Sequence, residues 1–290
     1  MKIGIAGTGR MGSALAGRLL GCGHEVVVWN RTAGKTKPLE AAGAKAAPAP
    51  TDLAARSDVV ITILTDAAAI DALYGGANGL LAGDVRGKLF IEMSTVRLPT
   101  EMALAEKVRA KGAALVDCPV GGSVGPAKEG KLFGFVGGEA GDVARARPIL
   151  DQLCRRVEHV GPVGAGARMK LAINLPLLVY WQALAEALAL CAPLGLEPER
   201  VIDILADTSG GPNVLKTRGA ALAATMQGKE TTPVTVDVET MRKDLRTMVE
   251  EAQASGFALP VTSRALECYD AVVDAGNGAR DITTFAVRKL

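Results

Sequence analysis

Up to about Pro162, short apolar runs alternate with segments that have the 3.6-residue periodicity of helices. Residues 11–23 and 100–112 have this periodicity, and each of these segments ends at a glycine. A repeated order of strand, helix and strand implies parallel pairing with right-handed crossovers, and consecutive apolar residues indicate strands that are covered on both faces. We therefore predict a doubly wound parallel α/β sheet, with strands at residues 2–7, 24–30, 58–64, 88–94, 113–120 and 131–138.

After Pro162 the pattern becomes helical. Residues 166–195 are apolar almost all round and predict one long helix that ends at Pro193 and Gly195. Such a helix is expected to be buried between domains or subunits. We find no convincing strand beyond it, and predict four further helices at residues 198–207, 213–226, 236–256 and 259–276. The chain is thus predicted to have two domains, residues 1–162 and 163–290.

Composition narrows the functional classes. The net charge is +2, and no Lys/Arg run is interleaved with aromatic residues, which argues against a nucleic-acid partner. No segment was expected to combine the length and uniform apolarity of a membrane span, so no membrane partner is predicted. The N-terminus has glycines and an arginine where a signal peptide needs apolar residues, and we expect a cytoplasmic protein.

Cysteine and histidine usage argues against a metal centre. The five cysteines lie far apart and form no C-x-x-C pair, which is typical of reduced thiols. With only two histidines, His24 and His159, a His-rich metal site or a Ser-His-Asp hydrolase is disfavoured. We expect both histidines to be structural and no metal to be bound.

The segment "GTGRMG" follows the first predicted strand and opens the first predicted helix. In that context G-x-G-x-x-G indicates dinucleotide binding. The first glycine permits a tight turn, the second lets backbone approach the pyrophosphate, and the third lets the helix pack close to the strand. The fold class is accordingly an N-terminal Rossmann-type doubly wound parallel sheet followed by an all-α C-terminal domain. The predicted cofactor-binding residues in this loop are Gly7, Thr8, Gly9, Arg10, Met11 and Gly12.

The end of the second strand indicates which dinucleotide is bound. NAD sites usually have an acidic residue there, whereas this chain has Asn30, Arg31 and Thr32. Arg31 can form charge-assisted bonds to a 2′-phosphate, to which Thr32 can add a hydroxyl and Lys35 a charge. We therefore predict NADP(H) as the cofactor. The alternative is that Arg31 is an ordinary solvated surface charge.

Five motifs, in this order, resemble those of the β-hydroxyacid dehydrogenase family over essentially the whole chain. This family includes 3-hydroxyisobutyrate dehydrogenase, tartronate semialdehyde reductase, and glyoxylate and succinic semialdehyde reductases. The motifs are "GTGRMGSALAGRL", "STVRLP" with Ser94 and Thr95, "DCPVGGS" from Asp117 to Ser123, Lys170 followed by Asn174, and Lys243-Asp244-Leu245.

The resemblance implies an NAD(P)-dependent enzyme that interconverts a small 3-hydroxy acid, or a related short hydroxy acid, with its aldehyde or ketone. It implies that Lys170 is the catalytic acid and base and that Asn174 is its partner. Further implied cofactor-binding residues are Leu64, Thr65, Ser94, Thr95 and Lys243, and the implied substrate-binding residues are Ser94, Gly121, Gly122, Ser123, Lys170, Asn174 and Lys243. The helical domain would complete the site, and we expect a homodimer or homotetramer.

The spacing of Lys170 and Asn174 fits this role but does not prove it. Residues four apart lie on one helix face, so both side chains point to a common region. A lysine that faces an apolar interior has a lowered pKa and becomes a useful acid or base near neutrality. By spacing alone, a snorkelling lysine with a cap-like asparagine is an equal alternative. Pro176 should kink this helix, either beside the site or only to suit domain packing.

Some positions depart from the family pattern and leave the substrate open. Gly121 stands where the family has a serine, and a serine follows at Ser123 instead. Val234 and Val236 occupy the region where the family often has an aromatic residue. The pocket is thus expected to be wider or more apolar. The alternatives are an imine reductase-like enzyme, or a catalytically silent binding or regulatory protein, against which the retained Lys170 argues.

Overall fold

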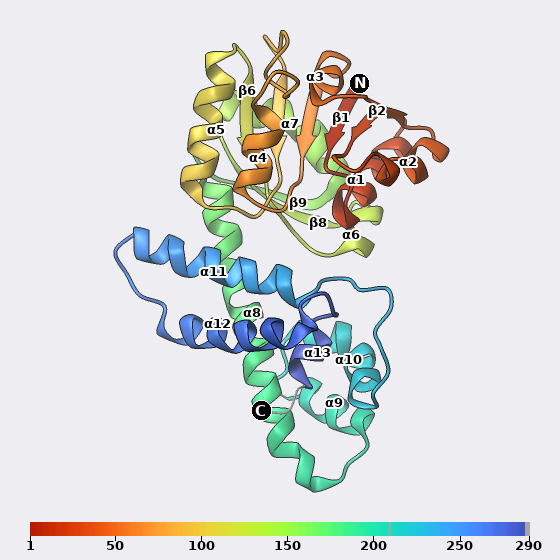
Figure 1. The fold of residues 1–290 in the computed structure, drawn as a ribbon, viewed down its shortest axis with the longest axis vertical. Coiled ribbons are helices and arrows are strands. Elements are labelled where there is room, and N and C mark those ends of the chain that lie inside the picture. The colour runs from red at the N-terminus through yellow and green to blue at the C-terminus, as the bar shows by residue number, and fades with distance from the viewer. Residues whose placement is uncertain (209, 288–290) are drawn as a thin grey trace. The chain divides into compact units, whose positions relative to one another are not determined.

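The computed structural model describes residues 1–208 and 210–287 (Figure 1). The chain divides into two compact units, Met1–Leu171 and the part from Ala172 onward, and each is described by itself. The predicted domain boundary precedes the long helix. The two compact units instead divide inside that helix, because its first two turns belong to the N-terminal unit.

Among the described residues of the N-terminal unit, nine strands form one sheet. Its order is β3-β2-β1-β4-β5-β6-β8-β7, and β9 pairs with β8. The path from β3 to β6 is parallel and has the strand order of a doubly wound dinucleotide fold, so the predicted fold class is confirmed. The strands are β1 Lys2–Ala6, β2 Glu25–Trp29, β3 Lys45–Ala46, β4 Val59–Thr62, β5 Leu89–Glu92, β6 Ala114–Asp117, β7 Val120–Gly121, β8 Leu132–Gly137 and β9 Cys154–Gly161.

One edge of the sheet departs from the predicted all-parallel pairing. β8 runs antiparallel to β6 and β7, while β9 is parallel to β8. The strands β3, β7 and β9 were not predicted. β3 and β7 have two residues each, too few for a recognisable pattern. β9 is the charged run "CRRVEHVG", in which only Cys154 and Val157 are buried, so it lacks the apolar stretch of the central strands.

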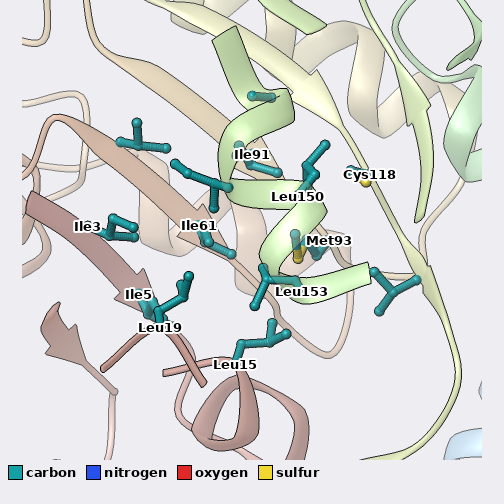
Figure 2. Packing of buried hydrophobic residues seen from close by; sticks show 14 of the residues in the cluster. Ile3, Ile5, Leu15, Leu19, Ile61, Ile91, Met93, Cys118, Leu150 and Leu153 are labelled. Carbon is teal, nitrogen blue, oxygen red and sulfur yellow. The ribbon is translucent and has the colours of Figure 1, made fainter. Parts of the chain in front are cut away.

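Helices cover both faces of the sheet, which explains why the central strands are apolar at consecutive positions. One face packs against α1 (Arg10–Gly21) and α7 (Ala140–Leu153) through Leu15, Leu19, Leu150 and Leu153 (Figure 2). The other face packs against α3 (Pro50–Ala55), α4 (Ala67–Tyr74) and α5 (Leu98–Ala110) through Leu53, Ile70, Leu73 and Leu104. The remaining short helices of this unit are η1 Ala33–Lys35, α2 Lys37–Ala41 and α6 Val124–Glu129.

The long predicted helix is present as α8 (Ala165–Cys191). A 3₁₀ turn, η2 (Ala192–Leu194), follows it, and Gly195 ends the segment in the left-handed region at φ +62°. The helix continues through Pro176. In the described part of the C-terminal unit the regular secondary structure is helical apart from an isolated bridge between Asp237 and Asp281. The helices that follow η2 are α9 Pro198–Ala206, α10 Asn213–Met226, α11 Val238–Ala254, α12 Pro260–Val272, η3 Val273–Asn277 and α13 Thr283–Ala286.

Aromatic residues form the centre of this helical unit. The rings of Tyr269 on α12 and Phe285 on α13 stack with centroids 3.8 Å apart. The Tyr269 hydroxyl donates to the backbone oxygen of Leu178 on α8 at 3.1 Å, and Trp181 on α8 is fully buried. α11 and α12 pack side by side (Figure 1). The last part of α8 is therefore anchored in the helical unit by its aromatic residues.

The expectation that no segment could span a membrane is wrong for length and composition. Among the described residues, the single helical stretch Ala165–Leu194 is long and apolar enough, and only 28% of its most apolar window is buried. In the sequence, the same apolarity indicated a helix that is buried between domains or subunits. Long core helices of soluble proteins have the same length and composition. Leu190 and Leu194 at the end of this stretch are exposed.

Candidate dinucleotide-binding and catalytic site

The glycine loop, residues 7–12, joins β1 to α1. Gly7 has φ +96°, and a Cβ there would lie 2.2 Å from the backbone oxygen of Ile63. A Cβ on Gly12 would lie 1.8 Å from the backbone oxygen of Gly7. These two glycines are therefore required by the packing of the chain itself.

Gly9 has a different reason to be glycine. A Cβ on Gly9 would meet no atom within 4 Å, so the protein leaves open space there. Gly9 is also the N-cap of α1, with no side-chain cap, and the first helical bond runs from Ser13 N to Gly9 O at 2.9 Å. A helix start leaves N–H groups without helical acceptors, and these bind phosphate oxygens. The open space and the helix start together fit a dinucleotide pyrophosphate.

The loop after β2 is tied to the glycine loop by Asn30. Its side-chain oxygen accepts from the backbone N–H of Thr8 at 3.1 Å, and its amide nitrogen donates to the backbone oxygen of Thr32, also at 3.1 Å. The Thr8 hydroxyl donates to the backbone oxygen of Lys35 at 3.3 Å. Arg31 is exposed beside this connection. Asn30 thus joins two loops of the chain, a structural contact that the sequence did not reveal.

The loops after β4 and β5 also meet. The backbone N–H of Leu64 donates to the Ser94 hydroxyl oxygen at 2.8 Å, and Ser94 is almost fully buried. A Cβ on Gly7 would lie 3.1 Å from a Leu64 methyl group, so the glycine loop adjoins this pair. Thr65 is exposed and Thr95 is half-buried. The predicted cofactor residues of the N-terminal unit therefore gather at the carboxyl ends of β1, β2, β4 and β5, where α/β sheets bind their ligands.

Three buried acidic residues at the same edge were not predicted as site residues. Two of them, Glu92 on β5 and Asp117 on β6, are neighbours in register, and Thr62 on β4 is the register neighbour of Glu92 on the other side. Glu101 on α5 is fully buried near them, and neither of its carboxyl oxygens has a hydrogen-bond partner among the described residues. A carboxylate at the end of an apolar strand, as in "LFIE" and "ALVD", was the available signal.

Burial raises the pKa of each of these acids. The Glu92 pKa is raised to about 7 by desolvation, with hydrogen bonds from Ser94 and Thr62 acting in the opposite direction. The Asp117 pKa is raised to about 6 by desolvation, which outweighs several backbone N–H bonds. Desolvation, and then the charges of Glu92 and Asp117, raise the Glu101 pKa well above its usual range. These acids therefore release their protons at a higher pH than ordinary carboxyl groups do.

Asp117 fixes the start of α8. Its two carboxyl oxygens accept from the backbone N–H groups of Gly164 at 2.7 Å and Ala167 at 2.8 Å. A Cβ on Gly166 would lie 2.2 Å from the backbone oxygen of Phe135, so only glycine lets α8 begin this close to β8. Lys170 follows one turn after Gly166 and is 9% exposed. Asp117 thus connects the sheet directly to the helix that carries the predicted catalytic lysine.

Asn174 lies one turn after Lys170 on the same helix and is half-buried. Because α8 is helical through both positions, their spacing of four residues agrees with the predicted common face. The lowered pKa expected for Lys170 and the roles of both residues remain predictions.

The remaining predicted substrate residues lie elsewhere in the chain. Gly121 ends β7, and Gly122 has φ +124°, with a Leu132 methyl group 2.8 Å from where a Cβ would be. Ser123 is exposed at the start of α6. In the C-terminal unit, the Lys243 ammonium group on α11 lies 2.6 Å from Asp244 Oδ1. Asp244 therefore forms an ion pair with the neighbouring Lys243.

Metal-binding residues do not gather in the part of the chain that the structure describes: no group of three or more His, Cys, Asp or Glu residues there could hold a metal ion. His24 Nε2 lies 2.8 Å from Gln152 Oε1, and His159 Nε2 lies 2.9 Å from the backbone oxygen of Gly138. Both histidines therefore contact groups of the chain itself.

Two protein-family models match this chain. Residues 2–161 match the model described as the NAD binding domain of 6-phosphogluconate dehydrogenase. Residues 164–288 match the model described as NAD-binding of NADP-dependent 3-hydroxyisobutyrate dehydrogenase.

Relatives match over nearly the whole chain. The NAD-dependent L-serine dehydrogenase of Pseudomonas aeruginosa is 33% identical, with 100% of this chain and 97% of the relative covered. The 3-hydroxyisobutyrate dehydrogenase of the same organism is 32% identical, with 99% and 97% covered. The solved structure of Mycobacterium tuberculosis 3-hydroxyisobutyrate dehydrogenase with L-serine is 26% identical and has a TM-score of 0.84, and the match covers 98% of this chain and 97% of that chain. With the glycine loop, the strand order and the helical second unit, these matches show that the chain belongs to the β-hydroxyacid dehydrogenase family of NAD(P)-dependent oxidoreductases.

Proposed function

We propose that this protein uses NADP(H) to interconvert a small 3-hydroxy acid, or a related short hydroxy acid, with its aldehyde or ketone. The observation that carries the proposal is Lys170, a 9%-exposed lysine one turn before Asn174, on a helix whose start Asp117 fixes to the sheet. A general acid must keep one position relative to the reacting atom. The anchored start of α8 gives Lys170 such a position.

The residues of the chain supply proton transfer and orientation. The bound dinucleotide supplies or accepts the hydride. In the reducing direction, Lys170 Nζ donates a proton to the substrate carbonyl oxygen, on which negative charge develops; in the oxidising direction it removes that proton. The Asn174 amide donates a hydrogen bond to the same oxygen. Both groups thus stabilise negative charge that develops on this oxygen in the transition state. Stabilisation of the transition state accelerates the reaction.

We propose a carboxylate on the substrate. Backbone N–H groups at Gly121 and Gly122 can donate to an anion, Ser123 can supply the hydroxyl that the family serine would otherwise provide, and Lys243 supplies a positive charge. The L-serine named with the Mycobacterium tuberculosis relative is a small carboxylate of this kind. Gly121→Ser should therefore lower KM for short acids. Lys243→Ala should raise KM for acids more than for uncharged aldehydes.

The cofactor choice is a separate proposal. Exposed Arg31 and Thr32 follow β2 where an NAD site usually has a carboxylate, and the family model of the second unit is described as NADP-dependent. The Pseudomonas aeruginosa L-serine dehydrogenase is NAD-dependent, so both dinucleotides belong in the test.

A cofactor-consumption screen tests the proposed reaction. Short 3-hydroxy acids, semialdehydes, 2-oxo acids, uncharged aldehydes and cyclic imines would each be assayed with NADPH or NADP⁺ and with NADH or NAD⁺. We expect turnover of short acids with the phosphorylated cofactor. Faster turnover of cyclic imines would favour imine reduction. Dinucleotide binding without turnover of any substrate would favour a catalytically silent regulatory protein.

We also propose that the protein is a cytoplasmic homodimer or homotetramer. Leu190 at the end of α8 and Leu194 in η2 are 82% and 63% exposed, and water contact of such apolar side chains is unfavourable. Light scattering after size exclusion should give two or four copies, and Leu190→Glu with Leu194→Glu should lower that number. A monomeric wild-type protein would contradict the proposal.

A further inference from the structure

We propose that Glu92 is a positioning residue for dinucleotide binding, because its carboxyl group holds the loop after β5 in place against the loop after β4. The proposal rests on the proposed function and on the cofactor-binding roles that the family resemblance implies for Leu64, Thr65, Ser94 and Thr95 in these loops. Glu92 itself lies in the last position of β5 and is fully buried.

The two oxygens of Glu92 bond to different strands. Oε1 accepts from the backbone N–H of Ser94 at 2.7 Å, in the loop after β5. Oε2 accepts from the hydroxyl of Thr62 at the end of β4, and that hydroxyl lies 2.9 Å from the hydroxyl of Tyr74 on α4. One carboxyl group thus fixes the carboxyl ends of the parallel strands β4 and β5 relative to each other.

Ser94 passes this constraint to the second loop. While its N–H donates to Glu92, its hydroxyl oxygen accepts from the backbone N–H of Leu64 at 2.8 Å. The position of Leu64 therefore depends on Ser94, and the position of Ser94 depends on Glu92. Because Glu92 and Ser94 are buried, water cannot readily replace these bonds if one is lost.

Packing alone does not explain a carboxyl group at this place. Burying an acid is unfavourable, and more so beside other acids. Glu101 from α5 and Asp117 from β6 act on the same region, and the Tyr74 hydroxyl faces it from α4. An apolar side chain at position 92 would fill the space without this penalty. What it could not do is accept hydrogen bonds from both Ser94 and Thr62.

Glu101 provides a matched comparison. It has the same side chain and is also fully buried, but neither of its oxygens bonds to any group in the described ranges. Removing its carboxyl group changes the same neighbourhood without touching either loop. A difference between changes at Glu92 and at Glu101 therefore reports on positioning rather than on burial of an acid.

The experiment measures two affinities by titration calorimetry for the wild type and for Glu92→Leu, Glu92→Gln and Glu101→Leu. In the proposed binding mode, NADPH would reach the loops after β4 and β5, whereas adenosine 2′,5′-bisphosphate would occupy the Arg31 side and the glycine loop and end before those two loops, so its affinity reports an intact fold. In Glu92→Leu we expect NADPH affinity to fall at least about tenfold, as for two lost hydrogen bonds, and bisphosphate affinity to stay within about twofold. Glu92→Gln keeps an acceptor for Ser94 and should lose about threefold for NADPH. Glu101→Leu should leave both affinities within about twofold.

Each outcome supports or overturns the proposal. Wild-type NADPH affinity in a folded Glu92→Leu protein would overturn it, as would equal losses for both ligands or a matching loss in Glu101→Leu. If Glu92→Leu does not fold, Glu92→Gln decides, and wild-type NADPH affinity there would overturn it. If the wild type binds NADH but neither NADPH nor the bisphosphate, the proposed cofactor is wrong. The same variants then test Glu92 with NADH and adenosine diphosphate.

Discussion

The glycine loop and the start of α8 show two different ways of building a site. The glycine loop works through missing side chains: Gly7 and Gly12 allow close packing, and Gly9 leaves open space. The start of α8 works through a side chain that is present, because Asp117 bonds to Gly164 and Ala167 and so fixes the helix of Lys170. Cofactor binding and proton transfer should therefore respond to different substitutions.

The largest effect is expected within the glycine loop itself. Gly12→Ala places a Cβ 1.8 Å from a backbone oxygen, so we expect it to lower the free energy of unfolding by at least about 3 kcal/mol. Gly9→Ala meets no atom within 4 Å and should lower stability by less than about 1 kcal/mol, the cost of alanine at an N-cap. It should still lower dinucleotide affinity at least about tenfold, because the methyl group occupies the space left for the pyrophosphate. Urea unfolding and calorimetry measure the two effects, and equal stability losses would contradict this distinction.

Lys170→Ala tests the other region. It removes the proposed general acid, so we expect kcat to fall at least about a hundredfold, at the low end for such a loss. Dinucleotide affinity should stay within about twofold, because binding depends on the glycine loop. Arg168→Ala, which removes an exposed positive charge two residues away, is the control and should leave kcat nearly unchanged. Near-normal turnover in Lys170→Ala would rule out the proposed proton transfer.

Buried acids give the N-terminal unit a pH dependence with a definite sign. A carboxyl group with a raised pKa keeps its proton in the folded chain after the unfolded chain has released it. Its contribution is complete below the unfolded pKa of about 4.5 and is lost as pH rises through the folded pKa, about 7 for Glu92. The unfolding free energy of this unit should therefore fall between pH 5 and pH 8.

Glu101→Leu should reduce that fall. It removes a buried acid without hydrogen-bond partners, so we expect about 2 kcal/mol of stabilisation at pH 8 and less at pH 5. Trp29 fluorescence in a Trp181→Phe background isolates the N-terminal unit during urea unfolding, since the chain has two tryptophans. Glu106→Leu on the exposed side of α5 is the control and should change stability by less than about 0.5 kcal/mol. A larger gain at pH 5 than at pH 8 would contradict the sign.

The parts of the fold that were predictable depend on repeated local patterns. The central parallel strands, α8 with its glycine end, and the helices of the second unit follow from runs of apolar residues and from helical periodicity. β9 was missed because its residues are mostly charged and exposed, and its pairing with β8 is specified by distant parts of the chain. The antiparallel direction of β8 was missed because a run of apolar residues does not specify the direction of its strand.

Some residues of the candidate site could likewise be predicted from the sequence, and others could not. The glycine loop could be predicted because steric demands on Gly7 and Gly12 restrict the residue type itself. Glu92, Glu101 and Asp117 could not be recognised as a group, since two strands and a helix bring them together only in the folded chain. Asn30 was predicted for cofactor binding, but its bonds to the loops at Thr8 and Thr32 depend on side-chain geometry.

The smallest expected effect concerns cofactor choice, which depends on one exposed side chain next to the glycine loop. Arg31→Asp replaces a positive charge that can pair with a 2′-phosphate by a carboxylate that repels it and accepts bonds from ribose hydroxyls. We expect the ratio of kcat/KM for NADPH to that for NADH to fall at least about tenfold, because a charge-assisted hydrogen bond contributes about 1.5–3 kcal/mol. Lys37→Asp makes the same charge change on the exposed surface of α2 and should shift the ratio far less. Since Asn30 holds this loop through its own amide, the loop should keep its conformation in Arg31→Asp, and the glycine loop should still bind the pyrophosphate. A wild-type preference for NADH, or an equal shift in Lys37→Asp, would show that Arg31 does not select the cofactor.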